Sequence, residues 1–100
     1  MKIWYVQTHP SEAEPQRYKH LFRSKALAWA YYRQAVADAR EYLKRDKEEY
    51  IERYGFWDGP DDYLSDRNVI EEAAVDQPDF FEMPSSPTKQ QIIETFNKIQ

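Results

Sequence analysis

The sequence contains no cysteine and only two glycines among its 100 residues. Without cysteine, neither a disulfide framework nor a thiolate metal site is possible. Gly55 and Gly59 are too few for a glycine-rich loop of the kind that holds phosphate groups. The G-x-S-x-G pattern of serine nucleophiles is missing as well. These absences exclude several well-marked classes of enzyme.

Histidine and long apolar runs are also scarce. His9 and His20 are the only histidines, and they do not have the H-x-x-x-H or HExxH spacing of a metal site. The first apolar stretch, from Ile3 to Val6, is too short for a signal peptide, and no segment approaches the length of a membrane span. We therefore expect a cytoplasmic protein without a metal or cofactor and without membrane contact.

The composition that remains is that of a folded domain. Apolar residues make up 41% of the chain and charged residues 32%, which is typical of globular proteins. One hundred residues is the size of one ordinary domain, so we expect a single α+β domain over residues 1–100. Aromatic residues reach 16%, with eight tyrosines and three tryptophans. Such side chains suit both cores and binding surfaces.

Three segments have the composition of strands. Lys2–Thr8 is rich in β-branched and aromatic residues and is apolar on both faces, so we expect both faces to be covered or one to meet a partner. Tyr18–Arg23 predicts the second strand of a hairpin, with Thr8 opposite Arg17. Asp79–Met83 predicts a short third strand that extends the hairpin.

One long helix is predicted after the hairpin. Ser24 is a good N-cap, no glycine or proline interrupts the pattern up to Tyr54, and Gly55 is a natural stop. Spacing of 100° per residue places one apolar stripe along it. The stripe consists of Ala28, Tyr32, Ala35, Ala39, Tyr42, Leu43 and Tyr50. At 1.5 Å per residue the helix is roughly 46 Å long, too long for a compact domain of about 13 Å radius of gyration. It must bend, project or pack against a second copy in a homodimer.

Two further segments are shorter. In residues 66–75 the apolar residues are spaced by i,i+4, which favours a short helix without excluding a strand, and Asp66 is a candidate cap. A last helix is predicted to follow Thr88 and to end near Lys98, because Thr88 and Gln91 form a capping box. Its expected apolar face consists of Ile92, Ile93, Phe96 and Ile99.

Charge is divided unevenly along the chain, whose net charge is −4. Residues 1–55 carry 11 bases and 8 acids, whereas residues 56–100 carry 3 bases and 10 acids. Between Asp58 and Glu82 there are nine carboxylates and one base, Arg67. This acidic segment either docks on the more basic half of the same chain or faces a partner.

The segment from Phe56 to Phe81 is the predicted contact surface, because large aromatics lie between its carboxylates. Aromatic anchors supply binding energy and a charged rim supplies steering. The candidate partner-binding residues are Trp57, Asp58, Asp61, Asp62, Tyr63, Phe80 and Phe81. We therefore predict a non-enzymatic protein-binding module that contacts a basic protein surface, as an inhibitor or regulatory adaptor. Small acidic domains of this type are common among phage and mobile-element proteins.

Two alternatives use other residues. Four bases form one stripe on the long helix that can follow a nucleic-acid backbone; they are Arg33, Arg40, Lys44 and Lys47. The carboxylates of Asp58, Asp61 and Asp62 could instead serve a metal-dependent hydrolase. Their spacing with Gly59 and Pro60 is explained more simply by turn formation.

Overall fold

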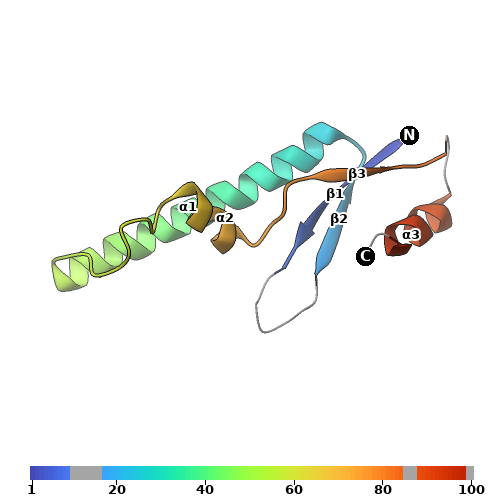
Figure 1. The fold of residues 1–100 in the computed structure, drawn as a ribbon. Helices are drawn as coiled ribbons and strands as arrows, with labels where there is room; N and C mark the ends of the chain where they lie inside the picture. Colours follow the sequence, from blue (N-terminus) through green and yellow to red (C-terminus); the bar gives the residue numbers. More distant parts are fainter. Residues whose placement is uncertain (10–16, 85–87, 99–100) are drawn as a thin grey trace.

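The computed structural model of the chain describes residues 1–9, 17–84 and 88–98, without the side chains of Thr95, Phe96 and Lys98. The predicted α+β class is confirmed. In chain order the elements are β1 (Lys2–Thr8), β2 (Tyr18–Phe22), α1 (Lys25–Tyr54), α2 (Asp66–Ala73), β3 (Asp79–Glu82) and α3 (Lys89–Lys98). The predicted third strand does extend the hairpin, and the three strands form one antiparallel sheet in the order β2-β1-β3 (Figure 1).

The register of the hairpin differs from the prediction by one residue. Thr8 lies opposite Tyr18 rather than opposite Arg17, and Trp4 lies opposite Phe22. A shift of one residue moves every side chain of a strand to the other face of the sheet. The observed register places Phe22 on the side of Trp4, where it packs against the core under α1. Burial of Phe22 is therefore the physical reason for this register.

Both faces of β1 are covered, in agreement with its apolar residues on both sides. On one face Val6 packs against Ala28 and Tyr32 of α1. On the other face Ile3 packs against Phe81. Ile92 of α3 packs against this second cluster. The sheet is thus the central layer, with α1 on one side and α3 on the other.

Helix α1 begins and ends where the sequence predicted. The hydroxyl of Ser24 accepts a hydrogen bond of 3.2 Å from the backbone N–H of Leu27. At the other end Gly55 has a φ of 80°, and its N–H donates to the carbonyl of Ile51. Only glycine adopts this left-handed conformation without steric cost, so Gly55 ends the helix and reverses the chain.

Helix α1 projects beyond the sheet. The molecule measures 59 × 28 × 17 Å with a radius of gyration of 17.6 Å, well above the roughly 13 Å of a compact domain of this length. Figure 1 shows the distal half of α1 leaving the sheet, with α2 and the preceding loop lying beside it. There Ala39 and Leu43 of α1 pack against Val69 of α2. Among the described residues, no helix has the length and apolar character needed to cross a membrane.

One residue of the predicted stripe on α1 is not in the core. Tyr42 is 59% exposed, although the stripe placed it in the core. Tyr42 and Leu43 point about 100° apart, and the short helix α2 covers only Leu43. Ala39 is buried, as a residue of the stripe should be, but it packs against α2 and not against the sheet. The returning chain, and not the sheet, covers this part of α1.

The ambiguous segment 66–75 is helical over α2. Its N-cap is Ser65 rather than Asp66, because the Ser65 hydroxyl accepts from the N–H of Asn68 at 3.2 Å. The helix ends at Ala74, which has a φ of 54°. Val75 then forms a single β-bridge with Thr8 and is buried in the core under α1. This turn brings the chain from the distal half of α1 back to the sheet.

Helix α3 starts with the predicted capping box. The backbone N–H of Thr88 donates to Oε1 of Gln91 at 2.9 Å, and the N–H of Gln91 donates to the Thr88 hydroxyl at 3.1 Å. Of the predicted apolar face, Ile92 packs on the sheet and Ile93 is exposed. The side chain of Phe96 and the whole of Ile99 lie outside the described residues.

Candidate functional site

The loop after α1 is organised around Trp57. Its indole N–H donates to the carbonyl of Pro60 at 3.1 Å, and its ring lies against Gly59 so closely that any side chain there would overlap it. The same ring meets Tyr50 at 5.3 Å and Tyr63 at 4.8 Å between centroids. The predicted contact residue Trp57 therefore holds the loop on α1, which is a structural role.

A hydrogen bond from Tyr63 fixes the end of this loop. The Tyr63 hydroxyl donates to the carboxylate of Asp46 at 2.6 Å. This bond, together with burial and the charge of Asp46, raises the pKa of Tyr63 from 10.0 to about 12. Asp46 lies on α1, so the contact joins the loop to the helix that it follows.

The raised pKa predicts how the stability depends on pH. In the unfolded chain Tyr63 ionises at its ordinary pKa of 10.0, and in the folded chain at about 12. The contribution to stability is thus complete below pH 10 and falls as the pH rises toward 12. We expect Tyr63→Phe to lower the free energy of unfolding by about 0.5–1.5 kcal/mol at pH 8, and by less at pH 11.5. Urea unfolding at both pH values, with Tyr31→Phe as the control, measures this; a loss that does not depend on pH contradicts it.

Next to the ordered loop lies an exposed apolar surface, here called the apolar tip, formed by Ile51, Tyr54 and Phe56. Their exposed fractions are 39%, 55% and 58%. Tyr50 lies behind them, with ring centroids 4.7 Å from Tyr54 and 6.4 Å from Phe56. Sequence reasoning did not select these three as contact residues. The available signal was their position around Gly55, where the chain reverses and leaves its outer side chains uncovered.

Acidic side chains lie in the loop that follows the apolar tip. Burial raises the pKa of Tyr50, and the negative charge of Asp58 raises it further. Asp61 and Asp62 are exposed, and within the part of the chain that the structure describes neither carboxylate has an ion-pair or hydrogen-bond partner. No three potential metal ligands come together among the described residues.

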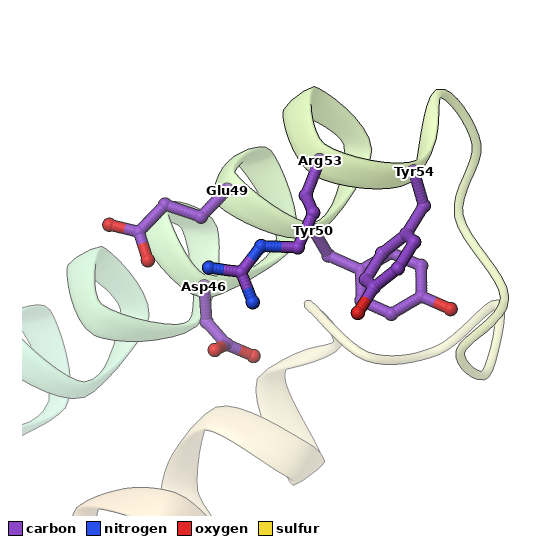
Figure 2. Close-up of a pocket in the computed structure, with 5 residues that line it drawn as sticks. All are labelled: Asp46, Glu49, Tyr50, Arg53 and Tyr54. Atoms are coloured by element: carbon purple, nitrogen blue, oxygen red, sulfur yellow. The ribbon is translucent and has the colours of Figure 1, made fainter.

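A small open pocket of about 150 Å³ lies beside the tip. Its lining residues are Asp46, Glu49, Tyr50, Arg53 and Tyr54. Figure 2 shows the Arg53 side chain reaching across the pocket toward Asp46, with Glu49 on the other side and the two tyrosine rings together at the end. The carboxylates of Asp46 and Glu49 therefore face a cation of the same chain, the Arg53 guanidinium.

The seven predicted contact residues lie in two separate places. Trp57 to Tyr63 lie at the distal end of α1, whereas Phe80 and Phe81 lie on β3 beside β1 (Figure 1). Phe80 packs against Trp4 at 5.0 Å between centroids, with the Lys2 ammonium 4.5 Å from its ring. Phe81, on the other face, is buried in the core. The structure therefore brings together the first five residues and not the last two.

The basic stripe of the nucleic-acid alternative is largely occupied by the chain itself. Arg40 forms an ion pair of 2.8 Å with Asp66, the first residue of α2. The ammonium of Lys47 lies 5.3 Å from the ring of Trp57. Arg33 lies over Trp29 at 5.7 Å, and Lys44 is exposed. Part of the acidic segment thus docks on the protein's own basic helix, while Asp61 and Asp62 remain exposed.

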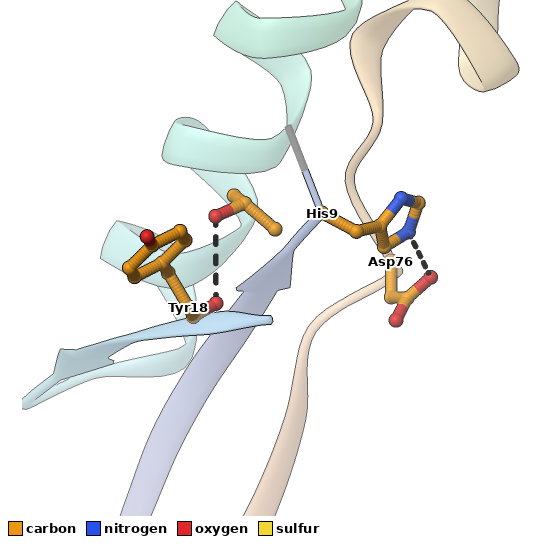
Figure 3. A network of polar contacts seen from close by, with 4 residues as sticks. His9, Tyr18 and Asp76 are labelled. Carbon is orange, nitrogen blue, oxygen red and sulfur yellow. Dashed lines mark hydrogen bonds and ion pairs between the residues drawn. The ribbon is translucent and has the colours of Figure 1, made fainter. Parts of the chain in front are cut away.

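The two histidines are both engaged in contacts around β1 and β2. Nε2 of His9 lies 3.2 Å from Oδ1 of Asp76, which joins the end of β1 to the segment before β3 (Figure 3). Nε2 of His20 lies 3.3 Å from the Thr8 hydroxyl, and its ring lies 5.1 Å from that of Tyr31. His20 lies on β2, at the edge of the sheet, and His9 directly follows β1.

The fold and the site define an α+β protein with a short antiparallel sheet and a projecting helix that carries an exposed apolar and acidic end. Comparison with protein-family models, with curated proteins and with solved structures finds no match for this chain. The function is therefore argued from the site alone.

Proposed function

We propose that this chain is a non-enzymatic protein-binding module that contacts a basic surface of its partner through the distal end of α1. The observation that carries the proposal is the apolar tip, three large exposed side chains at the same distal end of α1 as the exposed carboxylates of Asp61 and Asp62. A central apolar anchor surrounded by charge is the usual composition of a protein interface.

The rigid support of the tip favours tight binding. Tyr50, Trp57 and Tyr63 hold the loop against α1 through ring contacts and the hydrogen bond to Asp46. Because these contacts order the loop before binding, little conformational entropy remains to be lost on association. A role as an inhibitor or a regulatory adaptor follows if this surface blocks or recruits a basic site.

Two observations favour binding over catalysis as the role of this region. The carboxylates at the tip do not gather into a metal-holding group among the described residues. Both histidines lie on the sheet side of the molecule, engaged with Asp76 and with Tyr31. The aromatic and acidic side chains at the tip are typical of recognition surfaces.

Capture of the partner tests the proposal. The full chain is used as bait in an extract of its native host, and bound proteins are identified by mass spectrometry. We expect the unmodified chain to capture a partner with a basic surface. The double variant Tyr54→Ala, Phe56→Ala should no longer capture this partner. Tyr42→Ala is the matched control, since Tyr42 is an equally exposed tyrosine in the middle of α1. Equal capture by all variants, each checked for helical content by circular dichroism, would reject the apolar tip as the contact.

A further inference from the structure

The outer edge of β2 is a second surface, independent of the apolar tip. β2 is the first strand in the order β2-β1-β3, and among the described residues no strand pairs with its outer side. In an antiparallel edge strand, every second residue directs its N–H and C=O groups away from the sheet. Such an edge can pair with an added strand.

Apolar side chains flank this edge in both layers of the fold. On β2 itself, Tyr18 is 46% and Leu21 is 44% exposed, and they lie on opposite faces of the strand. Above the strand, Tyr31 of α1 lies 5.4 Å from Phe22 between ring centroids. Leu27, one helical turn before Tyr31, is 56% exposed. An added strand would therefore find apolar contacts on both of its faces.

The sequence of β2 and of the first part of α1 contains bases and no acids. Residues 17–37 contain five bases and no acid, in a chain whose net charge is −4. The five are Arg17, Lys19, Arg23, Lys25 and Arg33. The nearest acids along the sequence are Glu14 and Asp38. The first three bases lie within or directly beside β2.

We propose that β2 binds an extended acidic segment of a partner protein, which adds to the sheet as a fourth strand. Main-chain hydrogen bonds would fix the segment, its apolar side chains would contact Leu21 on one face and Tyr31 on the other, and its carboxylates would face the bases of β2. The chain's own β3 has the sequence DFFE, with acidic residues at both ends and apolar residues between them. It pairs with β1 at the opposite edge, so this sheet already contains a strand of that composition.

Other occupants fit less well. Pairing of β2 with β2 of a second copy would bring two basic strands together, and like charges directly opposite each other are destabilising. A nucleic acid would satisfy the charge but would leave the outward N–H and C=O groups of β2 without the pairing that a peptide supplies. Both are outcomes that the experiment below distinguishes.

The test uses a displayed library of random 12-residue peptides selected on the full chain. We expect enrichment of peptides in which Asp or Glu alternates with apolar residues. The double variant Arg17→Glu, Arg23→Glu should lower the affinity for the enriched peptides by about tenfold or more. The two new carboxylates would repel the acidic peptide both during association and in the complex. The matched control is Lys44→Glu with Arg45→Glu, an equal change of charge at exposed positions farther along α1, and it should leave binding unchanged.

Backbone amide shifts locate the peptide. In NMR spectra of the full chain, titration with the enriched peptide should move the amide signals of β2 and of Tyr31, and not those of the apolar tip. The proposal is overturned if no acidic peptide is enriched, if both double variants bind equally, or if the shifts fall elsewhere. The proposal is also overturned if β2 pairs with a second copy of the chain. Light scattering would then give a mass above the 12.1 kDa of one chain, and the Arg17/Arg23 double variant would return the mass to 12.1 kDa. If a single-stranded oligonucleotide binds and competes with the peptide, the proposal is also overturned, and β2 would be a nucleic-acid site.

Discussion

Replacing Leu43 by alanine is expected to lower the free energy of unfolding by about 2–5 kcal/mol. Leu43 is only 3% exposed and packs in the cluster with Val69, which is fully buried. This cluster is what attaches α2 to the distal half of α1, beyond the reach of the sheet. The truncation leaves a cavity that two helices joined by so small a cluster cannot refill. The loss is a large part of the roughly 5–15 kcal/mol that stabilises an ordinary domain.

Tyr42→Ala is the matched control for this experiment. Tyr42 is the preceding residue on the same helix, but it is 59% exposed. We expect its replacement to change the free energy of unfolding by no more than about 0.5 kcal/mol. Urea denaturation followed by circular dichroism measures both variants. If Leu43→Ala and Tyr42→Ala lower the free energy of unfolding by similar amounts, α2 does not cover Leu43.

The second large effect is on the rates at which the captured partner binds. We expect Phe56→Ala to raise the dissociation rate by about 30-fold, equivalent to about 2 kcal/mol, because an apolar anchor holds the complex once it has formed. Asp61→Lys with Asp62→Lys should instead slow association by about tenfold at low salt, because these carboxylates steer the basic partner. Trp57 is not suitable for this test, since its removal would disorder the loop around Gly59.

Salt separates the two contributions. Raising the ionic strength from low to physiological shortens the Debye length to about 8 Å, so the association rate of the unmodified chain should fall while its dissociation rate changes little. Glu71→Lys with Glu72→Lys, an equal change of charge on α2, should have a smaller effect. Surface plasmon resonance measures both rates. If Phe56→Ala acts only on association, the tip is not an anchor.

A different result would favour the nucleic-acid alternative. If the chain shifts duplex or single-stranded oligonucleotides at physiological salt, and Arg40→Ala with Lys44→Ala abolishes the shift, the basic stripe is the functional surface. The salt slope should then fall by about one for each lost phosphate contact. We expect no such shift, because Arg40 already pairs with Asp66 and Lys47 lies over Trp57.

Local chemistry in the sequence was sufficient to predict the three strands and the helices α1 and α3, whereas residues 66–75 were left open between a helix and a strand. Ser24 and Gly55 mark the limits of α1 because a hydroxyl that accepts an N–H and a residue that tolerates positive φ act within one helical turn. Thr88 and Gln91 mark the start of α3 for the same reason. The apolar residues on both faces of β1 predicted either a strand covered on both faces or one that meets a partner, and the structure has the first arrangement.

Five of the predicted contact residues lie at the distal end of α1: Trp57, Asp58, Asp61, Asp62 and Tyr63. The aromatic and acidic composition of this segment could be recognised in the sequence. Which of its residues support the loop and which are exposed could not. Trp57 was selected as an anchor for a partner, although its ring is committed to Gly59 and Tyr50. Phe56, which precedes it by one residue, was not selected and is exposed. Adjacent residues in a loop can face opposite ways, and only packing decides which of them is covered.

Only the tertiary structure decided the contacts between distant segments. The hairpin register depended on burying Phe22 under α1, because the long connection between the strands does not fix it through turn geometry. The separation of Phe80 and Phe81 from the distal loop follows from the return of the chain at Ala74 to the sheet. The partial docking of the acidic segment rests on the ion pair between Arg40 and Asp66, 26 residues apart. Such contacts depend on how the chain folds back on itself, whereas helix caps and strand composition act locally.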